Sequence, residues 1–144
     1  MNNLRQFYYR LLLLETIFIV CMIRISLWLL PFHIVISQIN RMTMKPAKRN
    51  HIDHRRLSFI AGNVAKVSRH VPKATCLTQA IAAMVLLKQY SYPATFHIGV
   101  TRDTAGQFEA HAWIESDGYV VIGGSKIDLY RRYSLMPQLK KYQT

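Results

Sequence analysis

The sequence predicts an α+β fold in which N-terminal helices precede a cysteine-bearing helix packed on a small antiparallel sheet. Two observations predict this order. Helical patterns of apolar residues run through residues 4–38, 53–71 and 76–87. Three short β-prone runs separated by turn residues then occupy residues 94–123, which is typical of a meander.

The composition indicates one strongly basic domain. The chain has 144 residues, with 19 Lys and Arg against 7 Asp and Glu, and 51% of its residues are hydrophobic. A net charge of +12 favours anionic partners such as nucleic acid, acidic lipid or acidic peptide, and charge alone does not choose among them. Neither Cys21 nor Cys76 has the spacing of a zinc ligand, so we predict free thiols in a reducing compartment, with no metal and no cofactor.

The first segment, residues 4–38, is predicted to be helical and to end or kink at Pro31. Glu15 and Arg24 interrupt it on roughly opposite sides of a helix, which suits neither a clean membrane span nor a surface helix. No small-residue cleavage site follows, so a signal peptide is not predicted. Three alternatives stay open: helices buried against the domain or a partner protein, attachment to a membrane surface, and a span.

A basic stretch, Arg41–Lys73, follows this arm. It holds nine Lys and Arg but a single acid, Asp53. Residues 42–49 are predicted to be a loop. Over residues 53–71 the apolar positions of a helix would face the core, and four basic residues would lie mostly toward solvent: Arg55, Arg56, Lys66 and Arg69. The stretch is either a solvated face or a docking surface for an acidic peptide, partner protein or lipid. Nucleic acid is not predicted, because no binding motif or interleaved aromatic residue accompanies the charge.

The remaining elements form a helix followed by a sheet. Thr75 is placed to cap a helix that begins at Cys76, and small residues such as Ala80 and Ala83 would let a sheet approach it closely. Strands are predicted over residues 94–101, 109–116 and 119–123, with the dipeptide at 117–118 as a two-residue hairpin turn. The chain thus divides into an apolar helical arm with a basic linker, residues 1–50, and a core, residues 51–144.

The chemistry is predicted to centre on Cys76 and His111. A cysteine that opens a helix, followed by a histidine on a later strand, is the layout of a papain-like or transglutaminase-like nucleophile site. A helix N-terminus and a neighbouring imidazolium both stabilise a thiolate, and the amides of the first turn can hold an oxyanion. Gln79, one turn further on, is predicted to face the same cleft. Trp113 shares the strand face of His111, where it either walls the site or belongs to the core.

Three linked motifs resemble a known family. Cys76-Leu77-Thr78-Gln79-Ala80, then Phe96-His97-Ile98-Gly99-Val100, then Ala110-His111-Ala112-Trp113-Ile114-Glu115 with Asp117-Gly118 are similar to the transglutaminase-like core of lasso-peptide maturation proteases. The resemblance covers roughly residues 70–137. It implies a cysteine peptidase core over residues 51–144 that removes the leader from a ribosomally made precursor, with Cys76 as nucleophile and His111 as base.

The resemblance also implies partners. A separate cyclase, similar to asparagine synthetase, would close the macrolactam after cleavage. The chain resembles the split form of the family, which needs a small leader-recognition protein. A cytoplasmic location is implied, with membrane contact through the N-terminal arm left open.

One departure from the family concerns the third catalytic residue. Family members place an Asp about twelve residues after the histidine, where this chain has Gly123. Asp128 is the candidate replacement, and a backbone carbonyl or a water is the alternative. Two other functions therefore stay open: a non-catalytic scaffold that holds the precursor or the cyclase, and acyl transfer to an amine, as in a transglutaminase.

Overall fold

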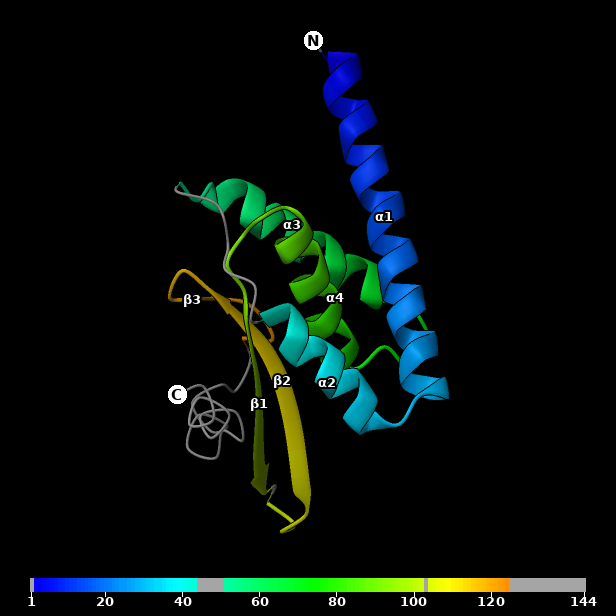
Figure 1. Ribbon diagram of the computed structural model, residues 1–144, viewed down its shortest axis with the longest axis vertical. Coiled ribbons are helices and arrows are strands. Elements are labelled where there is room, and N and C mark those ends of the chain that lie inside the picture. The colour runs from blue at the N-terminus through cyan, green and yellow to red at the C-terminus, as the bar shows by residue number, and fades with distance from the viewer. Residues whose placement is uncertain (1, 44–50, 103, 125–144) are drawn as a thin grey trace.

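The computed structural model describes residues 2–43, 51–102 and 104–124. The helices are α1 (Asn2–Leu29), α2 (Phe32–Thr43), α3 (His54–Ser68) and α4 (Cys76–Gln89), and the strands are β1 (Thr95–Arg102), β2 (Phe108–Ser116) and β3 (Tyr119–Ile122). Figure 1 shows the helices gathered on one side of the sheet, with the N-terminal end of α1 projecting away from it. The predicted α+β class and the order of its elements are confirmed.

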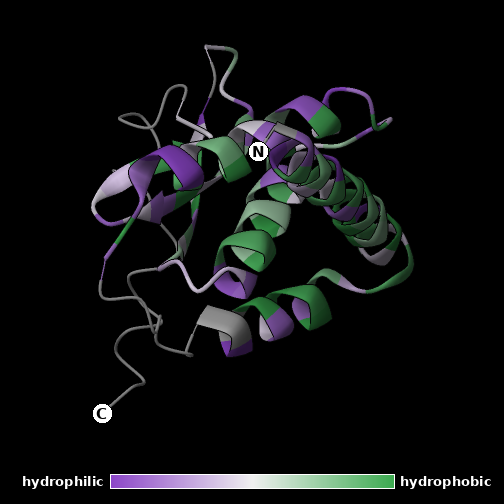
Figure 2. Ribbon diagram, turned by 90° about the horizontal axis from the view of Figure 1, so that it is seen from above, coloured by the Kyte–Doolittle hydropathy of each residue, from purple (hydrophilic) through white to green (hydrophobic). Residues whose placement is uncertain are grey.

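The N-terminal segment forms two helices separated at Pro31, as predicted. α1 packs against α3 and α4, whereas α2 makes smaller contacts with α1 and α4. The contact stripe of α1 is narrow, and Leu12, Thr16 and Val20 are buried in it at 1%, 0% and 0% exposure. Figure 2 shows hydrophobic residues along most of the length of α1, well beyond this stripe.

Helix α3 begins at a side-chain cap. The Asp53 carboxylate accepts hydrogen bonds from the backbone N–H groups of Arg55 and Arg56, which satisfies two amides of the first turn. The predicted core face is confirmed, because Leu57, Ile60, Val64 and Val67 are all buried. One detail differs from the prediction. Arg56 is half-buried instead of solvent-facing, because its guanidinium lies between the rings of Tyr8 and Tyr90.

Helix α4 is the centre of the molecule, with α1, α3 and β2 packed around it. Most of its residues are buried on every side, including the small residues Ala80, Ala82 and Ala83 at 0% exposure. Small side chains allow the helix and the sheet to approach closely, as the sequence predicts. A helix that is apolar all round belongs in a core. Because α4 is packed on all sides, it is a rigid support for its first residue, Cys76.

The sheet is a three-stranded antiparallel meander in the order β1-β2-β3, as predicted. Gly99 pairs with His111 and His97 pairs with Trp113 across β1 and β2. Asp117 and Gly118 have φ angles of 51° and 78°, so the hairpin turns through two left-handed residues. A register shift between Ile114 and Glu115 distorts the pairing of β2 with β3.

Candidate active site

Cys76 is the first residue of α4. Its thiol is free and half-buried, and the side chain packs against the edge of the hydrophobic core. Thr75 occupies the N-cap position, as predicted, but its side chain makes no capping hydrogen bond among the described residues. The amides of the first turn of a helix lack partners within the helix. At α4 they lie beside the thiol and point out of the helix end.

His111 lies on β2, the strand on which α4 packs. A five-residue connection, residues 90–94, turns the chain from α4 into β1, so β1 runs back along the helix and β2 runs in the same direction as α4. Cys76 is about 20 Å from the C-terminal end of α4, by the rise of a helix. Gly99, which pairs with His111, is about 13 Å from the start of β1 by the rise of a strand. Both residues therefore belong to the same half of the helix–sheet unit.

The imidazole of His111 is oriented by a backbone carbonyl. Its Nε2 lies 2.7 Å from the carbonyl oxygen of Gly123. A carbonyl oxygen can only accept, so Nε2 must carry the hydrogen and donate it. In the neutral ring this tautomer puts the basic lone pair on Nδ1. The arrangement meets one requirement of a Cys-His pair, because it defines which ring nitrogen could accept a proton.

Gly123 is the residue that makes this contact possible. Its φ of 77° lies in the left-handed region. A Cβ at this position would come within 2.7 Å of the Ala112 carbonyl oxygen and 2.8 Å of Trp113 Cβ, closer than such atoms approach. Only a residue without a side chain can pass so near to β2 in this conformation. The close approach brings the Gly123 carbonyl to the His111 ring.

Three other side chains line the sheet face of His111. The rings of His111 and Trp113 stack with centroids 6.3 Å apart, and the ring of His97 also stacks with that of Trp113, with centroids 5.2 Å apart. Glu115 accepts a hydrogen bond from Trp113 Nε1 at 3.2 Å and lies 3.5 Å from His97 Nε2. Trp113 is only 1% exposed, yet it is separate from the main core. It therefore packs on the sheet face that carries His111, apart from the cluster around α4.

The two faces of β2 restrict where a Cys-His pair can form. Ala112 and Ile114 belong to the core cluster that includes α4, whereas His111 and Trp113 point to the other face of the strand. A thiol on the side of α4 would face the opposite surface of β2 from the imidazole, so a Cys-His pair requires a cysteine at the end of the helix. Cys76 is the first residue of α4 and lies at that end.

Comparison with known proteins gives one match. The transglutaminase-like superfamily matches residues 19–136, which is most of the chain. The chain belongs to the transglutaminase-like superfamily. No curated protein and no solved structure matches it. This transglutaminase-like match begins within α1 and includes both Cys76 and His111.

The transglutaminase-like fold is typically that of a Cys-His-Asp hydrolase or transferase. Asp128, the candidate third residue, lies outside the described residues. Gln79 is half-buried and lies one turn along α4 from Cys76. The sequence did not single out Glu115 or resolve the place of His97. The strand register that joins them was the missing information.

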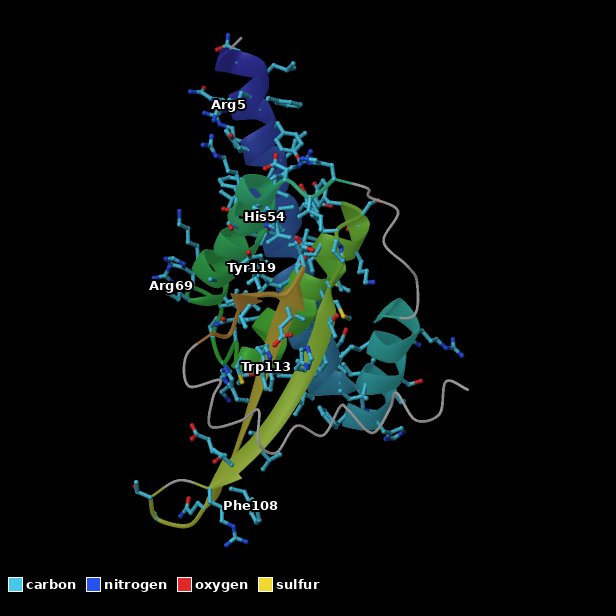
Figure 3. All side chains as sticks on the ribbon, turned by 90° about the vertical axis from the view of Figure 1, so that its left-hand side faces the viewer. Arg5, His54, Arg69, Phe108, Trp113 and Tyr119 are labelled. Carbon is cyan, nitrogen blue, oxygen red and sulfur yellow. The ribbon has the colours of Figure 1, made fainter. Side chains whose placement is uncertain are left out.

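A cleft of about 850 Å³ lies apart from this transglutaminase-like site, between the start of α1 and the start of α3. Three arginines line it together with aromatic rings: Arg5, Arg55 and Arg56 with Tyr8, Tyr9 and Phe59. Figure 3 shows Arg5 and Phe108 at opposite ends of the molecule, with Trp113 between them. Two of its arginines, Arg55 and Arg56, belong to the basic stretch Arg41–Lys73. Within the described residues no cluster of His, Cys, Asp and Glu fits a metal ion.

Proposed function

We propose that this transglutaminase-like chain is a cysteine endopeptidase that removes the leader from a ribosomally synthesised lasso-peptide precursor before macrolactam cyclisation. The superfamily includes cysteine peptidases and acyltransferases, which supports acyl transfer from a cysteine nucleophile as the reaction class. One observation carries the proposal further. The hydrogen bond from His111 Nε2 to the Gly123 carbonyl gives a base of defined tautomer on the strand beside α4, the helix that Cys76 begins.

In the proposed acylation step, Nδ1 of His111 takes the proton from the Cys76 thiol. The sulfur attacks the carbonyl carbon of the scissile peptide bond, and the carbonyl oxygen becomes an oxyanion. Backbone N–H groups of the first turn of α4 supply hydrogen bonds to that oxygen. As the intermediate collapses, the C–N bond breaks and the imidazolium gives its proton to the leaving amine, which is the N-terminus of the core peptide.

In the deacylation step, His111 acts as base a second time. It takes a proton from water, and the hydroxide attacks the thioester carbon. The C–S bond breaks, the leader leaves as a carboxylic acid, and the imidazolium returns its proton to the Cys76 sulfur, which restores the thiol. Gly123 holds Nε2–H throughout, so the same nitrogen serves in both steps.

The proposal includes partners and a location. A small leader-recognition protein would present the precursor, and a cyclase similar to asparagine synthetase would use the new amine. We propose that the reaction takes place in the cytoplasm, where a reducing environment keeps the Cys76 thiol free, with membrane contact through the N-terminal helices. The arginine-lined cleft, with its net positive charge, supports docking of an acidic segment of the precursor or of its partner.

The experiment is co-incubation of the full chain with the precursor peptide and the leader-recognition protein, followed by mass spectrometry. We expect release of leader and core, and we expect Cys76→Ala and His111→Ala each to abolish it. Cys21→Ala is the matched control, because Cys21 is the other free, half-buried cysteine and lies on α1. Denaturant unfolding shows that each variant remains folded.

The products separate the competing functions. Leader and core with the mass of one added water support hydrolysis. A cross-linked product with loss of ammonia indicates acyl transfer to an amine instead. Unchanged cleavage by Cys76→Ala would end the peptidase proposal. Binding of the precursor without any product by the wild-type chain would favour the scaffold function.

A further inference from the structure

The outer face of α1 is apolar along its whole length. Residues three or four positions apart form a continuous stripe that is 46% to 66% exposed: Phe7, Leu11, Leu14, Phe18, Met22, Ile25 and Leu29. The stripe spans about 33 Å, from the rise of 1.5 Å per residue. Soluble monomers seldom leave an apolar surface of this extent uncovered. A surface of this kind indicates a site of interaction with another protein or with a membrane.

The opposite face of α1 is fixed to the body of the protein. Leu12, Thr16 and Val20 are buried. The Glu15 carboxylate accepts hydrogen bonds from the Tyr90 hydroxyl at 2.5 Å and from the Gln89 amide, at the C-terminal end of α4. By length and composition, Asn3–Leu29 could cross a membrane. Crossing would pull this buried stripe out of the core, so the helix stays alongside the domain and offers only its outer face.

The charge of the N-terminal helices indicates what binds the outer face of α1. Residues 1–43 hold four arginines and one acid, Glu15. That acid is turned toward α4. On α1 itself, Arg10 is exposed and Arg24 is half-buried. A second copy of a chain with net charge +12 would be repelled electrostatically, whereas an anionic bilayer is attracted. Trp28, 77% exposed near the end of α1, is a residue type enriched at membrane–water interfaces.

We propose that α1 docks the protein on an anionic lipid bilayer and lies in the plane of the interface without spanning it. The apolar stripe would enter the boundary between headgroups and acyl chains, and the flanking arginines would contact anionic headgroups. The buried stripe and the Glu15 hydrogen bonds keep α4, and therefore Cys76, in place above the membrane surface.

Flotation of the full chain with vesicles tests this proposal. Vesicles of phosphatidylcholine alone are compared with vesicles that also contain phosphatidylglycerol. We expect the protein to float with the anionic vesicles, and we expect Phe18→Ser to lower the partition coefficient at least tenfold. Phe108→Ser is the matched control, because Phe108 is an equally exposed phenylalanine, 73% against 66%, on the far end of the sheet. It should leave binding unchanged.

Several outcomes would overturn the proposal. One is failure of the wild-type chain to float with either vesicle type, and another is a loss of binding in Phe108→Ser as large as that in Phe18→Ser. Resistance to extraction by salt and alkaline carbonate would indicate a span. A dimer in sedimentation that Phe18→Ser dissociates, without vesicle binding, would assign the face to a second copy. Cleavage of the precursor is measured separately, so failure here leaves the peptidase proposal intact.

Discussion

Replacement of Gly123 by alanine tests how the His111 ring is positioned. At a φ of 77° an L-residue is strained by about 1–2 kcal/mol. The new Cβ would also lie 2.7 Å from the Ala112 carbonyl oxygen and 2.8 Å from Trp113 Cβ, both held by β2. Overpacking of this kind costs about 1–3 kcal/mol. We therefore expect Gly123→Ala to lose about 2–5 kcal/mol of unfolding free energy.

Substitutions at two nearby glycines measure the backbone strain and the overpacking separately. Gly118 has nearly the same φ, 78°, but open space around its Cα, so Gly118→Ala should lose only the strain of about 1–2 kcal/mol. A Cβ on Gly124 would meet Val120 Cγ1 at 3.8 Å, an ordinary contact, so Gly124→Ala should change stability by less than about 0.5 kcal/mol. Denaturant unfolding of the three variants measures the order.

The same substitution should release the His111 ring. Displacement of the Gly123 carbonyl lengthens the Nε2–H···O bond, and a misplacement of about 1 Å can lower a rate about a hundredfold. Nitrogen NMR of the imidazole should show the Nε2–H tautomer in the wild type and a mixture in Gly123→Ala. Equal stability of the Gly123 and Gly124 variants, or an unchanged tautomer in Gly123→Ala, would refute the reasoning.

Three further predictions concern other parts of the molecule. Burial, and then the hydrogen bond to Glu15, raise the pKa of Tyr90. Its contribution to stability is therefore present below about pH 10, the ordinary pKa of tyrosine, and is lost as the pH rises above that value. Tyr90→Phe should reduce the fall of unfolding free energy at alkaline pH, and an unchanged slope would contradict this. Leu86→Ala, at a fully buried site, should cost about 2–5 kcal/mol in denaturant unfolding, and a loss under 1 kcal/mol would be inconsistent with that burial. Arg55→Ala in the cleft should weaken precursor cleavage and its salt dependence, whereas Arg69→Ala, at the other end of α3, should not; a salt-independent wild-type rate would return the basic stretch to a solvated face.

The sequence predicts the elements well because each has a local cause. The apolar spacing of Leu57, Ile60, Val64 and Val67 defines the buried face of α3 before any partner is known. The hairpin follows from a dipeptide that tolerates positive φ at both positions. Such features depend on residues a few positions apart, so one sequence is sufficient to find them.

The features that the sequence could not resolve depend on contacts between distant segments. Arg56 is half-buried because Tyr8, 48 residues away, accepts a hydrogen bond from it. The place of His97 beside Trp113 depends on the strand register. For Gly123, strand alternation predicts where side chains point but not where a carbonyl points. The sequence therefore showed that no carboxylate stands at position 123, and it left a backbone carbonyl as one of several alternatives for orienting His111.

A carbonyl in place of a carboxylate changes what the third group can do. The carboxylate of a triad fixes the tautomer of the histidine and also stabilises the imidazolium by its charge. The Gly123 carbonyl fixes the tautomer, but as a neutral acceptor it forms a weaker bond to a charged ring than a carboxylate does. In the proposed Cys76–His111 pair, with Gly123 as the orienting group, stabilisation of charge would shift toward the thiolate. The first-turn amides of α4, which the Thr75 side chain does not cap, would provide it. We therefore expect a Cys76 nucleophile to depend on its position at the start of the helix more than it would in a complete triad.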